Sequence, residues 1–200
     1  MTSPGRPWNV LLLGGASGVG KTSVSHRLAR HFGAAIAEVD DFQVLLERMT
    51  TPEQQPTIHF WRSHPAPDQL SPTEIVKQLG RHGRALGIGL EAVIANRLEA
   101  GTPVVLEGDF ILPALATRAR FLKQPNGGRV RAVFLHEPDE RQIAENYLMR
   151  EPSAGPQLKR ARVSWLASRW LEREAKRRGL PVVAARPWDT VLERVIAAVS

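Results

Sequence analysis

The stretch from Gly15 to Thr22 combines three glycines with a lysine and a hydroxyl residue in the spacing G-x-x-x-x-G-K-[ST]. This spacing is typical of loops that bind phosphates, because the glycines let the backbone turn tightly and point successive N–H groups inward. Lys21 is expected to reach the β- and γ-phosphates, and the Thr22 hydroxyl to bind Mg²⁺. The sequence therefore predicts a nucleoside triphosphate site formed by Gly15, Ala16, Ser17, Gly18, Val19, Gly20, Lys21, Thr22 and Ser23.

The residues on either side of this loop agree with that interpretation. Residues 10–13 are an apolar run typical of a buried strand, and Val24, Leu28 and Phe32 recur at helical spacing. The loop would thus join a strand to a helix N-terminus, whose partial positive charge favours anions. A chance glycine-rich turn explains neither flank.

Asp40 and Asp41 close a second predicted strand, residues 35–39, beside the predicted phosphate site. Phosphoryl transfer to a hydroxyl needs a carboxylate that orients or deprotonates the acceptor, and often another near Mg²⁺. Both residues are candidate catalytic groups, with Asp40 placed ahead of Asp41 and also considered for metal and acceptor contacts. The alternative is that both only cap the following helix.

Glu107 and Asp109 follow a third predicted strand, residues 102–106. Glu107 is a candidate for catalysis, for Mg²⁺ and for the acceptor, and Asp109 for the acceptor. A charge at a strand end with no further role is the alternative for Glu107.

Basic residues are concentrated late in the chain. Of the net charge of +7, the window from Arg150 to Arg178 carries +6, from nine basic and three acidic residues. Arg150, Arg160 and Arg162 flank a proline- and glycine-containing stretch that is expected to be mobile, which predicts a lid over residues 150–162 that brings cations to the transferring phosphate. The other basic residues of this window are assigned to a solvated helix face.

Two further regions are candidates for ligand contacts. Residues 50–71 contain four prolines and the side chains of Trp61 and Arg62, so we expect an acceptor-binding insertion over about 50–100, with Arg62 contacting the acceptor. Arg186 and Pro187 follow the last predicted strand and can frame an adenine. Four glycines between residues 80 and 89 predict a break or kink in a helix that begins near Ser71.

Predicted strands alternate with predicted helices along all 200 residues. This pattern predicts one domain of α/β class, with a five-stranded parallel sheet between two helical layers and ligands at the carboxyl ends of the strands. The chain has no cysteine and no apolar run of membrane-spanning length, and its polar N-terminus has no signal-peptide apolar region, so we expect a cytoplasmic protein. Nothing in the pattern indicates an oligomeric state.

Several stretches together resemble the small P-loop kinases of the nucleoside-monophosphate-kinase type, and most of all the 2-phosphoglycerate kinase group. These stretches are residues 14–22, Val39-Asp40-Asp41, Pro103 to Gly108 with Ile111-Leu112-Pro113, Glu140 to Arg150, and Glu174 to Val182. The resemblance implies a P-loop NTPase fold with a lid, and transfer of the γ-phosphate of ATP, with Mg²⁺, to a small metabolite such as a 2-phosphoglycerate-like acid. Where that group favours a Val-His pair this chain has Asp109-Phe110, and where it favours an Arg-Glu pair this chain has Gln43-Val44.

Other functions are less consistent with the sequence. An antibiotic O-phosphotransferase of the chloramphenicol type shares the Val-Asp pattern at residues 39–40 and stays open as an alternative. A GTPase switch needs D-x-x-G and N-K-x-D, and neither string occurs. A nucleic-acid-binding or ATP-sensing protein is permitted by the basic window, but the clustering of charge at a predicted lid argues for a small-molecule acceptor instead.

Overall fold

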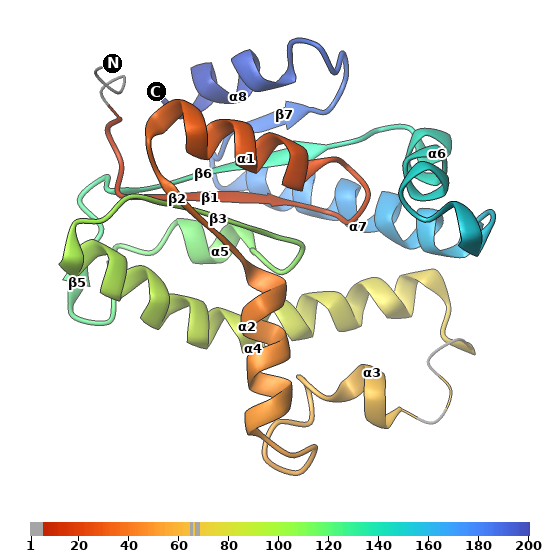
Figure 1. Cartoon of the computed structure of the whole chain (residues 1–200). Coiled ribbons are helices and arrows are strands. Elements are labelled where there is room, and N and C mark those ends of the chain that lie inside the picture. The colour runs from red at the N-terminus through yellow and green to blue at the C-terminus, as the bar shows by residue number, and fades with distance from the viewer. Residues whose placement is uncertain (1–5, 65, 67–68) are drawn as a thin grey trace.

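The computed structural model describes residues 6–64, 66 and 69–200. A parallel sheet of five strands lies at its centre in the order β2-β3-β1-β6-β7 (Figure 1). The strands are β1 (Val10–Gly15), β2 (Ala35–Glu38), β3 (Val104–Gly108), β6 (Val130–His136) and β7 (Val182–Ala184). The register pairs Val10 with both Val104 and Val130, so the first strand of the chain lies in the middle of the sheet. The predicted α/β class and five-stranded parallel sheet are confirmed.

Helices cover both faces of the sheet, which is why its strands read as continuous apolar runs. Leu11 and Leu13 pack under α1 (Lys21–Phe32) and α8 (Val191–Val199). Val10 and Leu12 face the other way, against α4 (Pro72–Ala100), α5 (Pro113–Ala116) and α7 (Leu158–Arg177). The three layers are separate in Figure 1.

Helix α4 runs unbroken over 29 residues, so the predicted break at its glycines is wrong. Ser71 and Glu74 form a capping box at its start, with Pro72 in the first turn. Gly83 is buried, and a Cβ there would lie 2.9 Å from the Leu112 side chain. The missing side chain therefore allows close packing, and tertiary contacts offset the low helix propensity of glycine.

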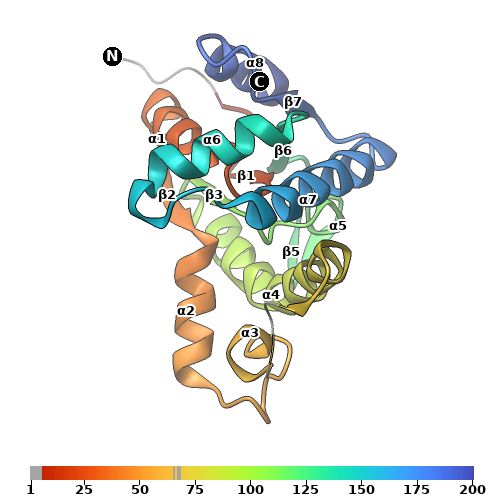
Figure 2. The same ribbon diagram turned by 90° about the vertical axis from the view of Figure 1, so that its right-hand side faces the viewer.

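The remaining elements extend from the carboxyl ends of the strands or join the main ones. Helix α2 (Val39–Met49) projects away from the sheet in both views, and α3 (Phe60–Ser63) lies in the insertion (Figures 1 and 2). Helix α6 (Glu140–Arg150) is followed by the single turn η2 (Pro152–Ala154), and β4 (Arg120–Phe121) pairs with β5 (Gln124–Pro125) in an antiparallel ribbon. Among the described helices, none is both long and apolar enough to cross a bilayer.

One boundary affects the site. Strand β2 ends at Glu38 and α2 begins at Val39, so Asp40 and Asp41 lie in the first turn of a helix. The sequence pattern had predicted them at the end of the strand, and this boundary is wrong. Acidic side chains suit this position because of the helix dipole.

Candidate active site

A cavity of about 530 Å³ opens at the carboxyl ends of the strands. The phosphate-binding loop, residues 15–22, lies in its middle because β1 is the central strand. On the β2–β3 side the cavity is lined by Glu38, Asp40, Glu107 and Asp109, and on the β6–β7 side by Asn146, Met149, Arg150, Arg186 and Trp188. Side chains from distant parts of the sequence thus meet where ligands bind in open α/β sheets.

The phosphate-binding loop has the backbone of an anion site. Gly20 precedes α1 with φ at +92°, and no side chain caps the first N–H groups of the helix. These donors are left for a ligand. A Cβ on Gly20 would lie 2.4 Å from the Trp188 ring, so this position needs glycine both for its φ and for the close approach of Trp188. Gly15, Ala16 and Val19 are buried, whereas Ser17, Gly18 and Ser23 line the cavity.

Lys21 is buried at the base of the loop. Its Nζ donates to the Ala16 carbonyl at 3.1 Å and pairs with Asp109 Oδ1 at 2.5 Å. Burial alone would lower the pKa of Lys21, but attraction to Asp109 and Glu107 outweighs it and the pKa is raised. The ammonium group is thus charged and held inside the cavity.

Thr22 and Glu107 are joined directly. Thr22 Oγ1 donates to Glu107 Oε1 at 2.7 Å, and Glu107 is only 4% exposed. Burial raises the pKa of Glu107, against the attraction of Lys21 and the hydrogen bond from Thr22. A hydroxyl and a carboxylate are oxygen ligands of the kind that Mg²⁺ prefers, so these two residues fit that ion. The described residues include no group of three or more Asp, Glu, His or Cys that could hold a metal.

Asp40 reaches the cavity from the first turn of α2 and keeps contact with solvent. Partial desolvation raises the pKa of this carboxyl group, and repulsion from Asp109 raises it further. Asp41 is exposed and is not among the described lining residues, so the structure brings only the first of the two aspartates into the cavity.

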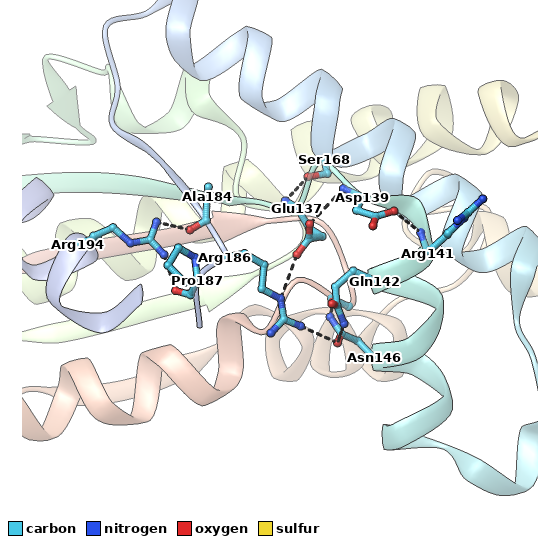
Figure 3. A network of polar contacts seen from close by, with 11 residues as sticks. Glu137, Asp139, Arg141, Gln142, Asn146, Ser168, Ala184, Arg186, Pro187 and Arg194 are labelled. Atoms are coloured by element: carbon cyan, nitrogen blue, oxygen red, sulfur yellow. Dashed lines mark hydrogen bonds and ion pairs between the residues drawn. The ribbon is translucent and has the colours of Figure 1, made fainter. Parts of the chain in front are cut away.

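On the β6–β7 side, a chain of polar contacts connects the loop to a buried carboxylate (Figure 3). Asn146 donates to the Gly18 carbonyl at 2.8 Å, and Arg186 donates to Asn146 Oδ1 at 3.4 Å. Arg186 Nε lies 3.6 Å from Oε2 of Glu137, which is 1% exposed. That oxygen has no hydrogen-bond partner among the described residues, so Arg186 is its nearest compensating charge.

The three candidate lid arginines are placed differently. Arg150 lines the cavity and pairs with Glu151 at 2.8 Å. Arg160 also pairs with Glu151 at 2.8 Å, and Arg162 pairs with Glu140 at 2.7 Å. Neither Arg160 nor Arg162 is among the described lining residues.

Two other candidates lie outside the described lining. Arg62, on α3, pairs with Glu47 of α2 at 2.7 Å. Pro187 is exposed, and its neighbours Arg186 and Trp188 line the cavity instead.

The sequence did not single out Glu38, Asn146, Met149 or Glu137. Glu38 lies two residues before Asp40, near the end of a predicted strand. That position could have marked it as a candidate lining residue. Asn146 follows Gln142 by four residues on one helix and accepts from its amide at 3.1 Å, a spacing that marks a polar helix face. Glu137 had no comparable signal, because its burial depends on the packing of α7 behind β6.

A family model described as an AAA domain (AAA_33) matches residues 10–172. The chain belongs to this AAA domain family. Its curated relatives include the 2-phosphoglycerate kinases of Methanothermobacter thermautotrophicus, 25% identical over 96% of this chain, and of Methanocaldococcus jannaschii, 26% identical over 90% of this chain. The aligned regions cover 65% and 59% of those proteins, so this chain spans less than two thirds of their length.

Solved structures share the fold of the AAA domain. A sugar kinase from Janibacter sp. HTCC2649 gives a TM-score of 0.57 at 22% identity, over 96% of this chain and 94% of that protein. A gluconokinase from Sinorhizobium meliloti 1021 gives 0.51 at 19% identity, over 98% and 93%. The predicted resemblance to small P-loop kinases is confirmed at the level of family and fold.

Proposed function

We propose that the chain is an ATP-dependent phosphotransferase that moves the γ-phosphoryl group of ATP to a hydroxyl, or phosphate, of a small molecule. One observation carries the proposal. Two residues of the phosphate-binding loop each contact a carboxylate at the carboxyl end of β3. Lys21 Nζ lies 2.5 Å from Asp109 Oδ1, and Thr22 Oγ1 lies 2.7 Å from Glu107 Oε1. Phosphate-binding and acidic groups are thus within one cavity, which is what phosphoryl transfer requires. The kinase names of the relatives support it.

The nucleotide is assigned to the phosphate-binding loop and the β6–β7 side. Loop amides and Lys21 would hold the phosphates, with Arg186 and Trp188 beside the base. Arg150 would face the transferring group from the end of α6. Arg160 and Arg162 are proposed to join it when the segment 150–162 closes over bound nucleotide, exchanging Glu151 and Glu140 for phosphate oxygens.

Thr22 and Glu107 would hold Mg²⁺, which supplies neutralisation of the charge on the phosphates. Glu107 suits this role because burial and its hydrogen bond to Thr22 fix its position before any ligand arrives. The sequence pattern also made Asp40 a candidate Mg²⁺ ligand. Its accessible position in the acidic part of the cavity suits contact with the acceptor better.

Asp40 is assigned as the general base. It takes the proton of the acceptor hydroxyl, the acceptor oxygen forms a bond to the γ-phosphorus, and the bond from that phosphorus to the bridging oxygen of ADP breaks. The raised pKa of Asp40 helps, because a stronger base accepts the proton more readily. Asp41 is assigned to the dipole of α2.

Two classes of acceptor are consistent with the relatives and with the sequence. The names of the relatives suggest a 2-phosphoglycerate-like acid. The Val39-Asp40 pattern keeps an antibiotic hydroxyl of the chloramphenicol type as a second class.

The test measures ADP release with a panel of small hydroxyl compounds, next to ATP binding by calorimetry. Asp40→Asn should lower kcat by about 10²- to 10⁴-fold, the usual contribution of a general base, and leave ATP affinity within about twofold. Asp41→Asn separates the two aspartates, and Glu99→Gln, an exposed change at the end of α4, is the matched control. Full turnover by Asp40→Asn would remove the base assignment, and failure of the parent protein to bind ATP would overturn the proposed function.

A further inference from the structure

Charge is distributed unevenly across the cavity. All four described carboxylates of its lining, Glu38, Asp40, Glu107 and Asp109, come from the ends of β2 and β3 or the residues after them. Its described cations are Lys21 in the loop and Arg150 and Arg186 on the β6–β7 side. Since the proposed function assigns the β6–β7 side to the nucleotide, the acceptor must enter on the side that holds the acids.

Lys21 is not available to compensate an acceptor charge. Its Nζ is already 2.5 Å from Asp109 and 3.1 Å from the Ala16 carbonyl, and it has to serve the phosphates of ATP. Assignment of Mg²⁺ to Thr22 and Glu107, and the ion pair of Lys21 with Asp109, would leave the charges of Glu38 and Asp40 facing the acceptor without a cation of their own.

The insertion does not add a cation to the described lining. No described residue between 41 and 106 lines the cavity. Arg62, the cation that the sequence had assigned to the acceptor, forms an ion pair at 2.7 Å with Glu47, whose side chain is only 6% exposed. Moving Arg62 into the cavity would leave a largely buried carboxylate without its partner, which is costly.

Repulsion among these carboxylates affects the pKa of Asp40. Partial desolvation raises the pKa of Asp40 most, and the charges of Asp109 and Glu38 raise it further, against the opposing charge of Lys21. A carboxylate or phosphate on the acceptor would add a further negative charge at the same place, whereas an ammonium group would relieve the repulsion.

From this distribution of charge we infer, on the basis of the proposed function, that the acceptor is an uncharged or amine-bearing polyhydroxyl compound. The same charges disfavour a phosphorylated or carboxylic acid, so of the acceptor classes in the proposed function this inference selects against the 2-phosphoglycerate-like acid. The carboxylates would accept hydrogen bonds from several hydroxyl or ammonium groups of the ligand, one of which loses its proton to Asp40.

The experiment uses acceptors that differ in charge but little in size. Glucose, glucosamine and gluconate form one series, and glycerol and glycerate form another, to which 2-phosphoglycerate is added as a larger and more highly charged member. Binding of each is measured by ligand-observed NMR with the full chain, Mg²⁺ and a non-hydrolysable ATP analogue, and turnover is measured separately by ADP release. We expect the uncharged or amine-bearing member to bind at least tenfold more tightly than its anionic counterpart in at least one series.

A charge variant tests the cause. Glu38→Gln should narrow the difference between glucosamine and gluconate by about threefold or more, whereas Glu99→Gln should leave it unchanged, because Glu99 lies at the far end of α4. Tighter binding of the anionic members, or no preference in either series, would overturn the inference whether or not any compound is phosphorylated. Preferential binding of an uncharged or amine-bearing member without ADP release would support the inference while contradicting the proposed phosphoryl transfer.

Discussion

The two sides of the cavity are built on different physical principles. On the β6–β7 side, Asn146, Arg186 and the buried Glu137 form a chain of contacts that ends on the carbonyl of Gly18. On the β2–β3 side, carboxylates repel one another, and the pKa values of Asp40 and Glu107 are raised. Attractive polar contacts thus join the groups of the first side, whereas the carboxylates of the second side repel one another.

This difference corresponds to two separate tasks. A nucleotide is recognised by shape and by donors aimed at its phosphates, so rigid support improves affinity. Proton removal instead needs a base whose pKa lies closer to neutral, and like charges in a partly desolvated place provide that shift. Substitutions on the two sides should therefore change different kinetic constants.

Among substitutions that affect nucleotide binding, the largest effect is expected from Gly20→Ala, next to Trp188. Its Cβ would meet the Trp188 ring at 2.4 Å and would force φ at +92° on a residue with a side chain. Strain of about 1–2 kcal/mol together with the clash should lower ATP affinity by about a hundredfold, measured by calorimetry. Gly101→Ala is the matched control, since it shares a positive φ of +66° but has no atom within 4 Å of its Cβ, and it should leave ATP affinity unchanged.

A smaller effect is expected from Glu137→Gln, which removes the charge that faces Arg186. The KM for ATP should rise by about fivefold to tenfold, the loss of one charge-assisted contact, while kcat stays close to that of the parent. Stability should not fall, because a buried carboxylate with an unpartnered oxygen contributes little to it. Thermal unfolding checks that point, and a drop in kcat with unchanged KM would contradict the positioning role of Glu137.

The sequence predicted the groups that act through local spacing. Residues 15–22 are adjacent in the chain, and Glu107 directly follows an apolar run, so motif and strand pattern were enough to find them. The sheet order was not readable in the same way. The contacts of Asn146 with Gly18 and of Trp188 with Gly20 join residues more than a hundred positions apart, and they depend on the placement of β6 next to β1 and of β7 next to β6.

One wrong expectation has a physical cause, and one untested assignment involves contacts that the sequence pattern did not predict. The low helix propensity of glycine predicts a break in α4. In the folded chain, burial of Gly83 against Leu112 outweighs that propensity. The assignment of Arg160 and Arg162 to a lid with Arg150 rests on their closeness in sequence and stays a prediction. In the structure Arg160 pairs with Glu151 and Arg162 pairs with Glu140. Composition alone does not predict these ion pairs.

The charged side should respond to pH in a way that Asp109→Asn alters. Asp40 must be ionised to act as a base, so activity is lost as the pH falls through its raised pKa. Removal of the Asp109 charge takes away repulsion and leaves Lys21 without its partner, and both changes lower the pKa of Asp40. The acid limb of kcat/KM against pH should therefore move to lower pH, and a move to higher pH would contradict the assignment of Asp40 as base.

The smallest effects concern the helix beneath the acidic side. Gly87→Ala places a Cβ in open space within α4 and should raise the free energy of unfolding by about 0.5–1 kcal/mol through helix propensity alone. Gly83→Ala shares that gain, but its Cβ would lie 2.9 Å from Leu112 and 3.1 Å from the carbonyl of Phe110, the residue after Asp109. It should therefore lower stability and raise the KM for the acceptor with little change in the KM for ATP. Chemical denaturation and the two KM values measure this, and equal changes in both KM values would mean that the two sides of the cavity are mechanically coupled through the sheet.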